Sequence, residues 1–357
     1  MAISRVAANF DRLEWWPAHL AGALSARVGV ERFLLAEGIQ PGYAADMDIS
    51  EALSGWDPET SFFLGSMMLP FRGINRLKIP TAVWTDYIDE YNRILIPLHR
   101  LFDQVFTTMK DSVAVLKKEG CRNVSWLPYA FDTTIRNEPE CERIHDVAFV
   151  GRLDLPNTKD ERRDILSSLD RKYRLNDYRK PVFGDDLMRT YNQARIVVNI
   201  PLRVAGGFNM RFFEAMASGA LLITKDLGYS RTDLFQPGSH FVTYRDRADL
   251  MDKVEYYLRN DRERTGIAQS GMKEVLSKHT YEHRAGEVLH VMESGLCRHG
   301  RSPDLATENA ALAVYYRYGR HSADLLADLA KSRGSSLKER LRLSATALGK
   351  LARRLIR

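Results

Sequence analysis

The stretch from residue 196 to residue 226 most strongly constrains what this 357-residue chain can fold into. Residues 196–200 form a short β-branched run that is typical of a buried parallel strand, and residues 221–224 form a second one. Between these runs, Phe212, Met216 and Ala220 recur at helical spacing. The pattern predicts a strand, a glycine turn, an amphipathic helix and another strand, which together make a βαβ unit.

The turn before this helix carries groups that suit an anionic ligand. Gly206 and Gly207 let the backbone approach a ligand closely, and the amides of the first helical turn attract an anion such as a diphosphate. Arg211 adds a permanently charged donor, and Glu214 can accept hydrogen bonds from two neighbouring sugar hydroxyls. The alternative is a plain glycine loop followed by a surface helix residue, because a short glycine motif is weak evidence by itself.

Five ordered blocks of sequence resemble group 1 glycosyltransferases of the GT-B fold, most closely the CgeB-like branch named after spore maturation proteins. The blocks are residues 146–151, residues 182–184 with Leu187 and Tyr191, residues 208–215, residues 234–238, and residues 279–281 with His283 and Arg284. The similarity covers residues from about 80 to 293. The resemblance implies an α/β chain with two Rossmann-like domains facing a cleft, the donor in the second domain and the acceptor in the first.

The implied activity is a metal-independent, cofactor-free and hexosyltransferase-like reaction in glycan biosynthesis. A sugar would move from a UDP-, GDP- or dTDP-linked donor to a polysaccharide, lipid-linked glycan or protein acceptor. Retaining relatives carry two glutamates eight positions apart, the first touching the donor sugar and the second the ribose; here the second is Glu214 and Gly206 replaces the first. Two alternatives stay open: a catalytically silent nucleotide-sugar-binding coat or assembly protein, and a nucleotide-sugar epimerase.

The resemblance also assigns site residues. Relatives neutralise the diphosphate with an arginine and a lysine from the turn after residue 151; here Asn157 holds the place of the lysine, so Arg152, Lys159 and Arg162 are candidates. A solvated helix face is the competing interpretation for Lys159 and Arg162. The expected donor-binding residues are Gly151, Lys159, Arg162, Phe183, Gly184, Gly206, Gly207, Phe208, Asn209, Glu214, Gly228 and Tyr229. The expected catalytic residues are Asp86, Arg152 and Arg211.

The first half predicts a second, less regular α/β unit. Strands are expected at residues 61–65, 81–85, 104–108 and 123–128, and a helix at residues 111–119 with Asp111 as its N-cap and Gly120 as its stop. Asp86 follows one of these strands and could take a proton from an acceptor hydroxyl if the enzyme inverts, or it could cap the next helix. Asp46 and Asp48 form a DxD pair that is set aside as a chance match, so no metal site is expected.

Length and composition agree with two domains, since 45% hydrophobic residues supply two cores. The expected boundaries are residues 1–135 for the acceptor-side domain, 136–279 for the nucleotide-sugar domain, 280–297 for a crossover helix and 298–357 for a helical extension. The polar segment 130–145 is the expected hinge. His19 lies at the start of an expected apolar helix, where a structural role is favoured over one in the acceptor site.

The basic charge of the chain is concentrated in its tail. Residues 331–357 hold nine Lys or Arg against one acid, a balance of +8, whereas the whole chain carries +6. Leucines on one face of this segment predict a cationic amphipathic helix that can lie on an anionic membrane, with a partner helix, a nucleic-acid contact or a disordered tail as alternatives. Aromatic residues are missing from the tail, which disfavours binding to single-stranded nucleic acid, and no nucleic-acid partner is expected.

The location follows from what the sequence lacks. The chain has no run of eighteen apolar residues, its first residues include an acid and lack a signal-type hydrophobic region, and its three cysteines are scattered. Neither a disulfide framework nor a zinc site is suggested. The expected location is the cytoplasm, with peripheral attachment to the inner face of the membrane through residues 331–357.

Overall fold

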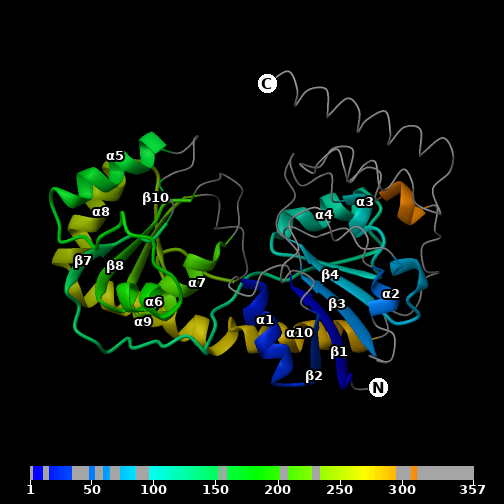
Figure 1. The fold of residues 1–357 in the computed structure, drawn as a ribbon. Coiled ribbons are helices and arrows are strands. Elements are labelled where there is room, and N and C mark those ends of the chain that lie inside the picture. Colours follow the sequence, from blue (N-terminus) through cyan, green and yellow to red (C-terminus); the bar gives the residue numbers. More distant parts are fainter. Residues whose placement is uncertain are drawn as a thin grey trace, which may run out of the picture. The chain divides into compact units, whose positions relative to one another are not determined.

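The computed structural model describes residues 3–10, 16–33, 48–52, 59–64, 73–85, 96–151, 153, 159–201, 208–226, 234–294 and 307–311. The chain divides into two compact units, Met1–Pro128 with Ala285–Arg357 and Tyr129–Arg284 (Figure 1). Each unit is built on one parallel sheet among helices. Both therefore have the Rossmann-like architecture that the sequence predicts.

The sheet of the first unit has six parallel strands in the order β2-β1-β3-β4-β5-β6. The strands are β1 (Arg5–Phe10), β2 (Gly29–Phe33), β3 (Thr60–Leu64), β4 (Thr81–Thr85), β5 (Gln104–Thr107) and β6 (Asn123–Trp126). The four expected strands are confirmed as β3 to β6, and β4 and β5 are buried along their whole length. The sequence analysis missed β1 and β2, which contain two alanines and an adjacent acid and base and so have weak β-propensity.

The helices of the first unit are short. They are α1 (Trp16–Ser25), α2 (Ile49–Ala52), the 3-10 helix η2 (Ile74–Arg76), α3 (Ile96–His99) and α4 (Lys110–Lys118). Gly120 adopts φ 91° just after α4, so the predicted stop is confirmed. The predicted cap is wrong: Met109 is the N-cap, and Asp111 lies in the first turn, where its charge suits the helix dipole. His19 lies inside α1 and not at its start.

The sheet of the second unit has four parallel strands in the order β10-β9-β8-β7. The strands are β7 (His145–Ala148), β8 (Ala194–Asn199), β9 (Leu221–Lys225) and β10 (Val242–Tyr244). The register pairs Val198 with Ile223 and Val147 with Ile196, which places these apolar side chains in one buried core. The predicted βαβ unit is confirmed as β8, α7 and β9.

Helices lie on both faces of this second sheet (Figure 1). They are α5 (Lys159–Asp170), α6 (Gly184–Asn192), α7 (Met210–Ala217), α8 (Arg247–Arg259) and α9 (Asp261–Lys278), followed by α10 (Tyr281–Glu293). Helix α9 packs closely against α7, because a Cβ at Gly271 would lie 2.4 Å from the carbonyl oxygen of His240 and 3.2 Å from Met216 Sδ. This packing fixes α7 on the sheet.

The backbone at the start of the second unit pairs with the backbone near its end. Phe131 N donates to the His279 carbonyl at 2.9 Å, and Tyr281 N donates to the Phe131 carbonyl at 2.9 Å. The segment expected as a hinge, residues 130–145, is bound to the second unit instead: Arg143 donates to the carbonyls of Ala194 and Ser218, both at 3.0 Å. The division between units falls after Pro128 and again inside α10, after Arg284.

Helix α10 lies within residues 280–297, the range predicted for a crossover helix, and its residues from Ala285 onward belong to the first unit. Glu293 at its end accepts a hydrogen bond from Ile3 N at 2.8 Å. In the expected extension the structure describes residues 307–311, where the buried Glu308 accepts a hydrogen bond from Ile74 N at 3.2 Å. The basic tail 331–357 lies outside the described residues. Among the helices that are described, none is both long and apolar enough to cross a bilayer.

Candidate donor-binding site

The start of α7 is tied to the carboxyl ends of two strands. Asn209 is the N-cap of α7, and its Oδ1 accepts a hydrogen bond from Phe212 N at 3.2 Å. Its Nδ2 donates to Asn199 Oδ1 at 3.3 Å, and Asn199 Nδ2 donates to Thr224 Oγ1 at 3.1 Å. The amides of the first turn of α7 therefore lie at the edge of the sheet where α/β proteins bind ligands.

Arg211 connects α7 to the end of β7. Its Nη1 donates to the Val150 carbonyl at 3.1 Å. Gly151 leaves room for this contact, since an added Cβ would lie 2.5 Å from Arg211 Nη1 and 2.8 Å from Phe149 Cζ. The expected donor-binding residue Gly151 and the expected catalytic residue Arg211 are thus brought together by the fold.

Arg162 supplies a second guanidinium at the same edge. It projects from α5, is 2% exposed, and its Nη2 donates to the Ile200 carbonyl just after β8. The guanidinium carbon lies 5.3 Å from the centre of the Phe149 ring. Burial, and then the nearby charge of Arg211, lower the pKa of Arg162 to about 10. The solvated-face interpretation is wrong for Arg162, and two cationic groups share the edge formed by β7 and β8.

Glu214 is a buried carboxylate one turn inside α7, with 9% of its surface exposed. Two fully enclosed tyrosines lie near it, Tyr191 on α6 and Tyr281 at the start of α10. Burial raises the pKa of each phenol, and the charge of Glu214 raises both further. The alternative of a surface helix residue is therefore wrong for Glu214. Both tyrosines belong to blocks that carry the resemblance, but nothing local in the sequence places them beside Glu214, so this contact was not predicted.

Three of the ordered blocks meet in one aromatic cluster behind α7. The ring of Phe208 packs on Phe212 at 4.6 Å and on Phe235 at 5.2 Å between centroids, and Phe235 packs on His279 at 4.8 Å. Phe208 is 3% exposed, so its ring belongs to the core and its backbone is what a ligand can meet. His279 Nδ1 lies 3.0 Å from Arg284 Nη2, and burial lowers the pKa of His279 to about 4. The packing of this cluster fixes the position of the start of α7.

Phe183 and Gly184 begin α6. The resemblance implies a strand at Val182 and Phe183, but the described residues 180–183 form no strand. Gly184 takes φ 52°, a left-handed conformation that favours glycine, and starts the helix. Phe183 is 77% exposed, which leaves its ring available to a planar ligand.

The remaining expected residues are not described. Asp86, Arg152, Gly206, Gly207, Gly228, Tyr229 and Asp46 lie outside the described residues, as does the side chain of Lys159. Asp48 is described: its Oδ1 accepts hydrogen bonds from Ser50 N at 3.0 Å and Glu51 N at 3.4 Å, and it forms an ion pair with Arg76. Asp48 thus has a structural role. In the described parts of the chain, His, Cys, Asp and Glu side chains form no group of three or more that could hold a metal ion.

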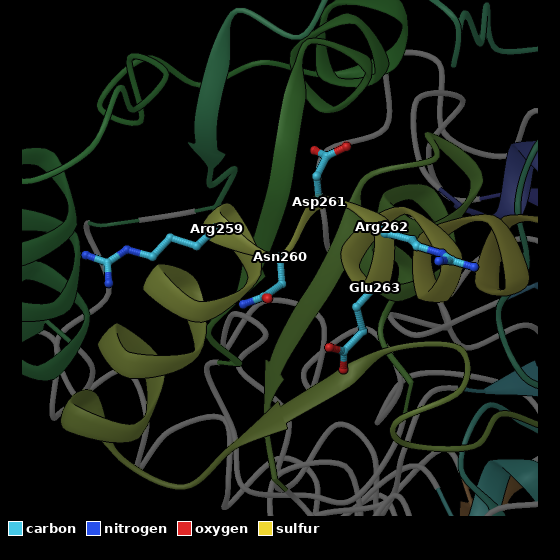
Figure 2. A pocket seen from close by; sticks show the side chains of 5 residues that line it. All are labelled: Arg259, Asn260, Asp261, Arg262 and Glu263. Carbon is cyan, nitrogen blue, oxygen red and sulfur yellow. The ribbon is translucent and has the colours of Figure 1, made fainter.

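A hollow at the junction of α8 and α9 does not show the features of a ligand site. It is lined by residues 259–263, and Figure 2 shows Arg259 and Arg262 pointing in opposite directions. Arg259 pairs with Glu255 at 2.5 Å, and Glu263 accepts a hydrogen bond from Tyr256 Oη at 2.8 Å. These polar groups diverge and bind neighbours on the helices, whereas a ligand site needs convergent ones.

Comparison with known proteins agrees with this geometry. Residues 145–290 match the protein-family model described as "Glycosyl transferase-like". A search of curated protein sequences finds no match. Sucrose-phosphate synthase from Thermosynechococcus elongatus is similar in structure, with 11% identity, 82% of this chain and 98% of that chain covered, and a TM-score of 0.58.

HepE from Anabaena, solved in complex with UDP, is also similar, with 10% identity, 82% of this chain and 100% of that chain covered, and a TM-score of 0.59. TarM from S. aureus has 12% identity, 70% and 58% coverage, and a TM-score of 0.50. At these identities the likenesses bear on the fold. They show that the chain has the GT-B fold, and with the family match they support a GT-B glycosyltransferase.

Proposed function

We propose that this protein is a glycosyltransferase that moves a sugar from a nucleotide-sugar donor to an acceptor hydroxyl. The observation that carries the proposal is the combination of a buried Glu214 carboxylate one turn inside α7 with the Arg211 and Arg162 guanidiniums at the edge of β7 and β8. A carboxylate suits the hydroxyls of a ribose, and guanidiniums suit a diphosphate. The family match over this unit and the complexes of HepE with UDP and with UDP and glucose support the same class of ligand.

In the proposed reaction, the diphosphate lies against Arg162, Arg211 and the first amides of α7, with Arg152 adding charge. An acceptor hydroxyl attacks the anomeric carbon, the bond between that carbon and the diphosphate oxygen breaks, and the nucleoside diphosphate leaves with the electron pair. Fixed guanidiniums and helix amides stabilise the negative charge that develops on the leaving group. This arrangement supplies by protein groups what a metal ion supplies elsewhere, so the proposed reaction is metal-independent.

We further propose the finer assignments that the sequence suggests. These are the CgeB-like branch, a hexosyl donor linked to UDP, GDP or dTDP, retention at the anomeric carbon, and a polysaccharide, lipid-linked or protein acceptor. Asp86 is the proposed base if the reaction inverts instead. The proposed location is the cytoplasm, with residues 331–357 on the inner face of the membrane. Gly206 stands where retaining relatives carry the glutamate that touches the donor sugar, so backbone amides of residues 206–209 are the proposed sugar contacts.

That glycine favours a second candidate, a nucleotide-sugar-binding protein without transferase activity. The two candidates predict different results when the pure protein is incubated with a panel of UDP-, GDP- and dTDP-sugars. A transferase releases nucleoside diphosphate and forms a glycoside or free sugar, both measurable by mass spectrometry. The silent protein shows a thermal shift with no turnover, and an epimerase converts the sugar while the nucleotide stays attached.

Metal dependence is tested in the same assay. We expect EDTA to leave turnover unchanged, because Arg162 and Arg211 already lie at the proposed diphosphate position. Strict dependence on added magnesium would contradict the proposal and return attention to Asp46. If no nucleotide in the panel shifts the unfolding temperature, the result would contradict nucleotide binding altogether.

A further inference from the structure

Tyr191 carries a buried polar group that the proposed function does not yet use. The side chain projects from α6 and is 0% exposed. Its hydroxyl has no hydrogen-bond partner among the residues that the structure describes. Buried phenols normally find a partner, because an unmade hydrogen bond in the interior lowers stability. A hydroxyl held in this way is suited to a bond that forms only when a ligand is present.

The surroundings of Tyr191 indicate which group would accept that bond. Glu214 and Arg211, both on α7, are the two charged side chains that act on its phenol, and the Glu214 charge adds to burial in raising its pKa. The phenol therefore stays protonated, and remains a donor, at any physiological pH. Of these two charged side chains, Glu214 is the one that can accept the bond, since a guanidinium only donates.

The position of Tyr191 relative to α7 is fixed by backbone contacts. Arg143 donates to the Tyr191 carbonyl at 3.3 Å and to the Ser218 carbonyl, just after α7, at 3.0 Å. Asn192 Nδ2 also donates to the Ser218 carbonyl at 3.3 Å. The ends of α6 and α7 are thus held together, and the phenol keeps its place beside Glu214.

We propose that Tyr191 is a positioning residue for the nucleotide, whose hydroxyl donates to the Glu214 carboxylate when the ribose is bound. The inference rests on the proposed function of Glu214. A carboxylate has about four lone-pair positions, and two ribose hydroxyls occupy two of them. The hydrogen bonds from the ribose select one orientation of the carboxylate. The Tyr191 phenol then donates to a remaining position and stabilises this orientation. The residue acts through Glu214 and need not touch the ligand.

Tyr191→Phe removes this hydroxyl and nothing else. We expect the unfolding temperature to stay level or rise slightly, because the lost group has no partner among the residues that the structure describes. We expect the Kd for UDP or GDP, whichever binds the wild type, to rise roughly tenfold, as for one hydrogen bond to a charged acceptor. The matched control is Tyr173→Phe, which removes another buried phenol oxygen of the same unit just after α5, and should change neither quantity.

Two further titrations separate positioning from a structural role. The effect of Tyr191→Phe should shrink for the 2′,3′-dideoxy form of the same nucleotide, which lacks the ribose hydroxyls, and in a Glu214→Ala background, which lacks the acceptor of the phenol. Wild-type affinity in Tyr191→Phe would overturn the inference. A lower unfolding temperature, together with an equal loss of affinity for the ribose nucleotide and for its dideoxy form, would also overturn the inference. If the wild type binds none of UDP, GDP and dTDP, the proposed function itself fails, and the inference with it. Binding of dTDP alone would overturn the inference and leave the proposed function standing.

Discussion

Arg162 gives the sharpest separation between a ligand-binding and a structural role, because the sequence left both open. Replacing it by methionine, Arg162→Met, keeps an unbranched apolar stem and removes the charge. The change deletes the hydrogen bond to the Ile200 carbonyl and the contact with Phe149. It also removes a buried cation that lies near Arg211.

These effects on folding largely cancel. A hydrogen bond from a charged donor contributes about 1.5–3 kcal/mol, and a desolvated cation–π contact contributes about 2 kcal/mol. Against them, the lowering of the Arg162 pKa from 12.5 to about 10 corresponds to a cost of about 3 kcal/mol for holding the charged form in the interior. We therefore expect Arg162→Met to change the free energy of unfolding by only about 1–2 kcal/mol, measured by urea denaturation.

Nucleotide binding should change much more. Two unit charges about 5 Å apart interact by roughly 3 kcal/mol at an effective dielectric constant of about 20. Losing one cation from a diphosphate site should then weaken binding by roughly 100-fold, since 1.4 kcal/mol is a factor of ten. Isothermal titration with a nucleoside diphosphate measures this, with Arg163→Met, on the exposed face of the same helix, as the control. A variant that loses stability but keeps the wild-type Kd would refute the role of Arg162 in diphosphate binding.

Three other changes test separate parts of the account. Gly151→Ala places a Cβ 2.5 Å from Arg211 Nη1, so we expect it to displace that guanidinium and weaken nucleotide binding about tenfold, and unchanged titration curves would contradict this. His99 is fully buried, and burial lowers its pKa from 6.5 to about 4. The unfolded chain takes up the proton below pH 6.5, so this residue destabilises the first unit by about 2 kcal/mol at pH 5, and His99→Phe should flatten thermal stability between pH 7 and pH 5. Deleting residues 331–357 should preserve turnover and reduce sedimentation with anionic liposomes, and equal sedimentation would remove the membrane hypothesis.

Strands β8 and β9 of the second sheet could be predicted because they are buried along nearly their whole length. Strands of that kind read as continuous β-branched runs, as in β8 and β9, and the helix between them has a strong apolar period. The four predicted strands of the first unit follow the same rule. The strands β1 and β2 do not, since their sequences mix alanine, asparagine and charged residues. Pairing in the folded sheet makes them strands: β1 pairs with β3, and β2 pairs with β1.

The sequence predicted several residues of the candidate site, but it did not predict their side-chain contacts. Gly151, Arg211 and Glu214 follow from a motif, yet the sequence could not show that Arg162 is buried, because helical period alone does not say that a charged residue stacks on Phe149. Tyr191 was missed as a partner of Glu214 because the two lie on different helices that meet only in the folded unit. Long-range packing decides such contacts, and local patterns carry little information about it.

The most direct test of the central claim is a titration of nucleoside diphosphates into the wild-type protein and the Glu214→Ala variant. We expect the wild type to bind UDP, GDP or dTDP, and we expect Glu214→Ala to raise the Kd for the same nucleotide at least tenfold. The control is Glu263→Ala, which removes an exposed glutamate from α9 and should bind as the wild type does. Equal affinity of the wild type and Glu214→Ala for the nucleotide would contradict the claim that α7 forms the donor site.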